Sequence, residues 1–228
     1  METLTKFLCQ YCRKTFARET SLAVHVCEQK KRRQERNERG VELGFQAYLK
    51  FYETTQGSSR LKTYDDFCES SYYKAFVKYG RYCVNTRVIN PTQFLMWLLK
   101  QNKKIDHWAS DTVYTQWLQE YLLVEHINDA LSRSIEFAID WAEQNQSQPQ
   151  DCLRYGNHNR ICHAIATGRV SPWAIYNSES GQRLLTELST EQLAMIWPYI
   201  DSDAWQKKFA DYPADRAYAQ DILSKAGW

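Results

Sequence analysis

The residues best suited to chemistry lie near the start of the 228-residue chain. Cys9 and Cys12 are separated by two residues, and twelve residues lie between Cys12 and His25. Thiolate sulfur and imidazole nitrogen are the ligands that Zn²⁺ prefers in tetrahedral structural sites. A Cys-x2-Cys pair supplies two ligands from one short turn, and a following helix supplies His25. The spacing therefore predicts a zinc site at the N-terminal end of the chain.

The fourth ligand does not follow from the spacing alone. A second histidine usually follows the first by three to five intervening residues, but positions 29–31 hold Gln-Lys-Lys. The nearest thiol is Cys27, and a two-residue helical step turns side chains about 200° apart. Cys27 can therefore join His25 only if the helix unwinds or tightens after His25. We favour Cys27 because thiolate is the softer ligand; the carboxylate of Glu28 and a degenerate three-ligand site are the alternatives.

Residues 7–27 resemble a zinc finger of the two-cysteine, two-histidine family in which the last histidine is replaced by Cys27. Phe16 and Leu22 stand at the positions that the family fills with apolar core residues. The resemblance covers about a tenth of the chain. It implies two short strands and a helix around one structural zinc ion, with one helix face entering the DNA major groove.

Carried over by position, the base-reading places of the family fall on Arg18, Ser21 and Val24. Arg18 can contact guanine through two parallel hydrogen bonds, whereas Val24 can make only apolar contacts. A lone finger covers about three base pairs and is weakly specific. Two roles for this module stay open: contact with nucleic acid, and contact with protein or bracing of the fold.

The segment 28–39 (EQKKRRQERNER) is basic and has no apolar stripe. Its residues are mostly good helix formers, and we expect a solvated helix that continues from the finger and stops at Gly40. Phosphate contact is one interpretation, and a charged connector is the other. The cations are Lys30, Lys31, Arg32, Arg33, Arg36 and Arg39.

A second basic segment, 72–82, interleaves cations with aromatic rings. Lys74, Lys78 and Arg81 share one helix face if a helix persists through Gly80. A basic face beside aromatic rings is typical of single-strand binding. The simpler interpretation is that the rings form a core and the lysines are its solvated outside.

Charge is divided unevenly along the chain. Residues 1–104 carry 20 Lys/Arg and 10 Asp/Glu, whereas residues 105–228 carry 9 and 17, so the net charge of +2 hides a basic half and an acidic half. Such asymmetry indicates a polyanion-facing end and a different partner for the other end. We expect nucleic acid as one partner, DNA more than RNA, and a protein partner for the acidic C-terminal half.

The remaining sequence predicts a mostly α fold. Helical patterns and caps recur after residue 40. The sequence predicts a helix that ends at Gly80, a helix that starts at Asn90–Pro91 and a helix that ends near Pro198. The polar stretch 143–150 suggests a division of the helical body, and aromatic residues reach 14%, enough for a dense core. The aromatic-rich composition of residues 41–228 resembles that of uncharacterised proteins of large tailed phages, although no motif matches. The expected organisation is a finger at 1–27, a basic helical connector at 28–40, a helical domain at 41–145 with a basic first half, and an acidic helical subdomain at 146–228.

The chain has no apolar run long enough to span a bilayer and no signal peptide. We therefore expect a protein of the cytoplasm of a bacterial or phage-infected cell, or of the nucleus in a eukaryote. The sequence favours a nucleic-acid-binding accessory protein that is largely non-sequence-specific. The alternatives are a structural or assembly subunit whose finger docks on protein, and a DNA-processing enzyme built from dispersed carboxylates, although no catalytic motif is present.

Overall fold

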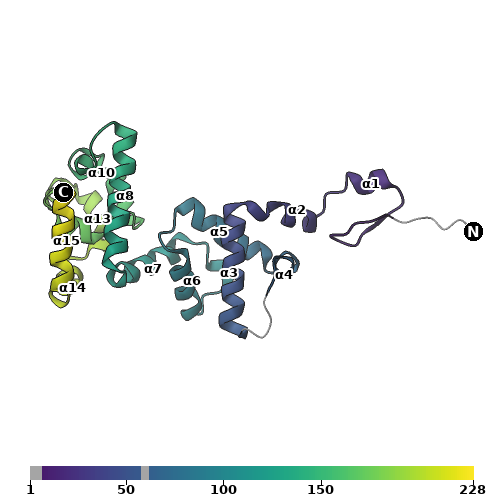
Figure 1. Ribbon diagram of the computed structural model, residues 1–228. Coiled ribbons are helices and arrows are strands. Elements are labelled where there is room, and N and C mark those ends of the chain that lie inside the picture. The colour runs from purple at the N-terminus through teal and green to yellow at the C-terminus, as the bar shows by residue number, and fades with distance from the viewer. Residues whose placement is uncertain (1–6, 58–61) are drawn as a thin grey trace, which may run out of the picture. The chain divides into compact units, whose positions relative to one another are not determined.

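The computed structural model describes residues 7–57 and 62–228. The first six residues of the predicted finger range lie outside this description. The protein is mostly α-helical, as the sequence predicts, and the strands among the described residues form one two-stranded sheet near the N-terminus (Figure 1). The chain divides into two compact units, Met1–Ser110 and Asp111–Trp228. The polar stretch 143–150, where the sequence suggests a division, lies within the second unit.

The first unit holds the two short strands, the segment predicted to form the finger and a group of helices. Its elements are β1 (Phe7–Leu8), β2 (Thr15–Phe16), α1 (Glu19–Ala23), α2 (Glu28–Gln34), the 3-10 helix η1 (Glu35–Asn37), α3 (Arg39–Gln56), α4 (Tyr64–Glu69), α5 (Tyr73–Thr86), α6 (Pro91–Lys100) and the 3-10 helix η2 (Ile105–His107). The start of α6 follows the sequence signal, because Asn90 caps the helix and Pro91 occupies its first position.

Aromatic rings build the core of this unit. Phe67 and Phe76 have no exposed surface, and Trp108 is 1% exposed. The rings of Phe76 and Trp108 meet edge to face, with their centroids 5.8 Å apart. Tyr48 from α3 packs on Phe76 in the same manner at 5.5 Å. Such edge-to-face contacts add to the free energy gained by burial, so α3, α4, α5 and Trp108, which directly follows η2, share one core.

The most extensive contact between elements of the described part of the unit is that of α3 with α5, which lie side by side (Figure 1). A Cβ atom placed on Gly80 would lie 2.0 Å from the carbonyl oxygen of Gly40 and 2.5 Å from the amide nitrogen of Gly44. The two helix backbones therefore touch where only glycine fits. The sequence-based expectation that helices stop at Gly40 and Gly80 is wrong, because both glycines are packing positions inside helices.

The second unit is entirely helical within its described residues. Its elements are α7 (Asp111–Val124), α8 (Ile127–Asn145), the 3-10 helix η3 (Pro149–Asp151), α9 (Cys152–Tyr155), α10 (His158–Ala166), α11 (Pro172–Asn177), α12 (Glu179–Glu187), α13 (Thr190–Ile200), α14 (Ser202–Asp211) and α15 (Pro213–Lys225). Its core includes Trp173, which packs on Trp205 and Phe209 at centroid distances of 5.8 and 5.1 Å.

Helix α13 continues past Pro198, where the sequence predicts its end. A proline inside a helix removes one backbone hydrogen bond, but tertiary contacts hold the last turn. The indole N–H of Trp205 donates to the carbonyl oxygen of Tyr199 at 2.9 Å. The hydroxyl of Tyr176 donates to the carbonyl oxygen of Ile200, which is itself buried.

Replacing Gly80 by alanine tests the contact between α3 and α5. Alanine favours a helix over glycine by about 1 kcal/mol, but the added Cβ would force the two backbones apart. We expect the steric effect to win and the free energy of unfolding to fall by about 2 kcal/mol or more, measured by urea denaturation. The control is Glu42→Ala at an exposed position of α3, which should change stability by less than about 0.5 kcal/mol. Equal or greater stability of Gly80→Ala would contradict the close contact.

Candidate metal centre

Four soft donors gather at the N-terminal end of the first unit. Cys9 and Cys12 flank the turn after β1, and His25 and Cys27 follow α1. The Sγ atoms of Cys9 and Cys27 are 3.9 Å apart, and the Sγ atom of Cys12 is 3.3 Å from Nε2 of His25. All four donor atoms lie within 4.8 Å of one another. The cluster is therefore close enough to hold one metal ion.

The turn that carries the two N-terminal thiols is fixed by its backbone. The N–H of Cys9 donates to the carbonyl oxygen of Lys14 at 2.9 Å, and the N–H of Arg13 donates to the carbonyl oxygen of Cys9 at 2.8 Å. Arg13 adopts a left-handed conformation with φ 57°, which few non-glycine residues adopt. These bonds close a tight loop and bring Cys9 and Cys12 to the same side.

The strands and α1 bring the second pair of donors to the first. β1 and β2 pair antiparallel, with Phe7 opposite Phe16. The ring of Phe16 packs against the ring of His25 with centroids 4.7 Å apart. Leu22 is half-buried on α1. Phe16 therefore packs directly against one donor residue, as the resemblance implies for its position.

The backbone between His25 and Cys27 is not helical. α1 ends at Ala23, and Cys27 adopts an extended conformation with φ −112° and ψ 159° as the N-cap of α2. The expectation that the basic helix continues from the finger is therefore wrong. A continuous helix would have pointed Cys27 away from His25. The break satisfies the condition under which Cys27 can share a metal with His25.

Backbone N–H groups and neighbouring thiols shift the pKa values of two donors of this cluster. The backbone N–H of Cys12 lowers the pKa of the Cys9 thiol. The N–H of Lys14 also acts to lower the pKa of Cys12, but burial and the thiols of Cys9 and Cys27 outweigh it, so that pKa is raised. The pKa values of the two neighbouring thiols Cys9 and Cys12 therefore move in opposite directions. A metal ion at the cluster would hold its coordinating thiols as thiolates.

Glu28, the alternative fourth ligand, is engaged elsewhere. Its carboxylate accepts a hydrogen bond from Nε of Arg32 at 3.4 Å and lies 3.9 Å from Nζ of Lys74. It is not part of the four-donor cluster. Cys27 supplies the fourth donor atom instead.

Two arginines of α2, predicted to contact nucleic acid, hold the helix against the rest of the unit. Arg32 donates from Nη1 to the carbonyl oxygen of Cys68 at 2.7 Å and stacks 4.5 Å from the ring centroid of Tyr73. Arg33 donates to the carboxylate of Asp65 at 2.9 Å. Sequence reasoning missed this role, because partners more than thirty residues away leave no local signal.

The other predicted contact residues differ in their surroundings. Arg18 directly precedes α1 and Ser21 lies on it, and both side chains are exposed. Lys30 is half-buried and makes no ion pair with the described residues. Lys31 lies 3.8 Å from Glu35, and Arg36 lies over the ring of Tyr64 at 5.0 Å.

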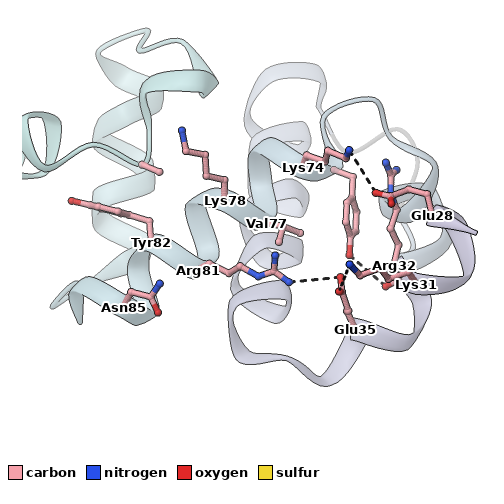
Figure 2. A pocket seen from close by; sticks show the side chains of 12 residues that line it. Glu28, Lys31, Arg32, Glu35, Lys74, Val77, Lys78, Arg81, Tyr82 and Asn85 are labelled. Atoms are coloured by element: carbon pink, nitrogen blue, oxygen red, sulfur yellow. Dashed lines mark hydrogen bonds and ion pairs between the residues drawn. The ribbon is translucent and has the colours of Figure 1, made fainter.

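The three cations of α5 lie on one helix face, as predicted, because the helix persists through Gly80 (Figure 2). Lys74 and Lys78 are exposed, and Arg81 donates two hydrogen bonds of 2.6 Å to the carboxylate of Glu38. All three line a groove of about 600 Å³. The facing wall comes from α2 and η1, an arrangement that the sequence alone does not indicate.

Across the described parts of the chain, no other group of three or more His, Cys, Asp or Glu side chains is close enough to hold a metal. The buried carboxylate of Glu125 pairs with Arg133 at 2.8 Å and accepts a hydrogen bond from Ser171 at 3.1 Å. Burial raises the pKa of Glu125 even beside this arginine.

None of the helices in the described ranges is both long and apolar enough to cross a bilayer. Comparison of the chain with protein-family models, curated proteins and solved structures found no match.

A Co²⁺ titration of Cys27→Ser tests the fourth donor. Loss of a direct ligand should weaken metal binding by at least the roughly 10- to 100-fold that loss of a supporting hydrogen bond costs. The thiolate-to-cobalt absorption should also weaken, because one of three thiolates is removed. Cys162→Ala is the control, since this buried thiol lies in the second unit. An unchanged cobalt spectrum and affinity in Cys27→Ser would exclude Cys27 as a ligand.

Proposed function

We propose that the protein is a zinc-stabilised nucleic-acid-binding accessory protein that contacts its ligand largely without sequence specificity. The observation that carries the proposal is the charge of the finger itself. Arg13, Lys14 and Arg18 are all exposed, and none forms an ion pair with the described residues. Glu19 is the one acidic residue between positions 7 and 27. A small module with unpaired, exposed cations is suited to contact phosphates.

Zinc is the metal that the donor set fits best. A tetrahedral zinc site has Zn–S bonds of about 2.3 Å and Zn–N bonds of about 2.0 Å, so its S–S and S–N edges measure about 3.8 and 3.5 Å. The distances of 3.9 Å between the thiols of Cys9 and Cys27, and 3.3 Å between Cys12 and His25, agree with these edges. Four protein ligands leave no open position, so the proposed zinc has a structural role.

The geometry of α1 supports contact without sequence specificity. Val24 caps the C-terminal end of α1 and offers only an apolar side chain, which cannot hydrogen-bond a base. Arg18 is the one base-reading position whose side chain can form two hydrogen bonds with a base. Phosphate contacts, which carry no sequence information, should therefore dominate. By the resemblance, DNA is favoured over RNA, and the acidic C-terminal half is proposed to contact a protein partner.

Neutralising two cations of the finger tests this function. Lys14→Ala/Arg18→Ala should weaken binding to labelled duplex and single-stranded DNA of several sequences by a similar factor. Loss of two duplex phosphate contacts should reduce the slope of log affinity against log salt by about 1.8. Lys100→Ala/Lys104→Ala removes the same charge from exposed positions of the same unit and is the control. Salt-independent binding, or no binding by the wild-type protein, would refute the proposal.

A second function, docking of the finger on a protein, is favoured by exposed apolar side chains. Leu8, Val24 and Val26 are 55%, 79% and 72% exposed on a module of about twenty residues. Exposed apolar side chains mark contact sites where they form one contiguous patch, and docking on a protein would require these three to do so.

The docking function has a distinct signature. Full-length protein that is purified under mild conditions, then treated with nuclease and washed in high salt, should retain a partner protein in stoichiometric amount. Leu8→Ser/Val24→Ser should lose that partner while Lys14→Ala/Arg18→Ala keeps it, because the two pairs remove apolar area and charge separately. A lone monomer after this treatment would argue against docking.

A further inference from the structure

The groove of about 600 Å³ in the first unit joins elements that are distant in sequence (Figure 2). α5 forms one wall, and α2 with η1 forms the other. Five cations and two carboxylates line it, so its charged side chains sum to a positive excess. They are Lys31, Arg32, Lys74, Lys78, Arg81, Glu28 and Glu35.

Three lysines of this groove are available to an incoming anion. Nζ of Lys31 is 3.8 Å from Glu35, and Nζ of Lys74 is 3.9 Å from Glu28. Both lysine side chains are mostly exposed, at 63% and 78%. Long, exposed pairs of this kind are weak and easily exchanged. Lys78 forms no ion pair within the described residues.

The two arginines of the groove are held in place. Arg81 forms a two-point pair with Glu38, and Arg32 donates to the carbonyl oxygen of Cys68 while stacking on Tyr73. They supply fixed positive charge, while the lysines supply mobile donors. Glu35 lies between the two sets, 3.8 Å from Lys31 and 3.7 Å from Arg81.

The shape favours one strand of phosphates over a single small anion. Lys74 and Lys78 are one helical turn apart on the same face, and Lys31 lies on the opposite wall (Figure 2). Tyr82 lines the same groove beside them. Cations spaced along a groove, with an aromatic side chain among them, are the features that bind single strands.

We propose that this groove binds the sugar–phosphate backbone of a nucleic-acid single strand, with Glu35 as an internal competitor for its cations. Lys31, Lys74 and Lys78 contact phosphates, and the strand displaces the long pair between Lys31 and Glu35. This inference rests on the proposed function but names a site and a strand type separate from the finger.

The first test uses a fluorescein-labelled dT20 oligonucleotide and a salt series with the full-length protein. Lys74→Ala/Lys78→Ala removes two phosphate contacts, which lowers the salt slope by about 1.4 for a single strand. Affinity should therefore fall about 25-fold at 0.1 M salt and approach that of the wild type near 1 M. Lys100→Ala/Lys104→Ala, with the same change of charge outside the groove, should stay within about twofold of wild type. Equal weakening by both pairs would overturn the site, because net charge alone would then explain the effect.

The second test predicts a change of opposite sign. Glu35→Gln should strengthen dT20 binding several-fold, because it removes the carboxylate that competes for Lys31 and Arg81. Glu42→Gln makes the same change of charge at an exposed position of α3 that does not line the groove, and it should have little effect. Unchanged or weaker binding by Glu35→Gln would overturn the competitor role. Thermal unfolding of each variant confirms that the fold is retained.

The outcomes separate this inference from the proposed function. If the wild-type protein binds no nucleic acid, both fail. If it binds dT20 and Lys74→Ala/Lys78→Ala binds equally well, the groove fails while the function stands. Inorganic triphosphate is the remaining probe. If triphosphate competes with dT20 at equal phosphate concentration, the groove takes free phosphates and the strand assignment is overturned.

Discussion

The extended backbone of Cys27 is the constraint on which the N-terminal part of the structure depends. Its φ of −112° and ψ of 159° end the finger, and the same residue begins α2 as its N-cap. Its Sγ atom belongs to the four-donor cluster and also accepts a hydrogen bond from the N–H of Lys30 at 3.4 Å. One side chain therefore links the geometry of the four-donor cluster to the direction in which α2 leaves it.

That direction matters because α2 packs on α4 through arginines rather than apolar residues. A guanidinium group has several donors in one plane and a flat face, so Arg32 can bond a carbonyl oxygen and stack on Tyr73 at once. A lysine ammonium lacks this geometry. In the run KKRR, the lysine at 31 is exposed, whereas the arginines at 32 and 33 are half-buried against the body. The basic segment is thus partly an interior contact and partly a charged surface.

The features that the sequence predicted well are local ones. The spacing of the four donor residues and the helix start at Asn90–Pro91 depend on residues that are close in sequence. A local sequence pattern is therefore enough to predict both features. Gly40, Gly80 and Pro198 were predicted to end helices, which is their local tendency. Here a close helix crossing and the buried last turn of α13 override that tendency. The groove could not be predicted, because it needs α2 and α5 to face each other across an unknown fold.

The carboxylates of the first unit explain how so basic a surface can be stable without a ligand. Like charges placed together destabilise a folded protein, and Glu28 and Glu35 lie among the cations of α2 and α5. Their pairs with Lys31 and Lys74 are long, so they relieve repulsion without locking the lysines. Glu38, by contrast, holds Arg81 at two points, and the arginine lowers the pKa of that carboxyl. Under the proposed function, a bound polyanion replaces the carboxylates in the long pairs of Lys31 and Lys74. The short pair between Arg81 and Glu38 stays intact, so binding need not disturb the packing of α5.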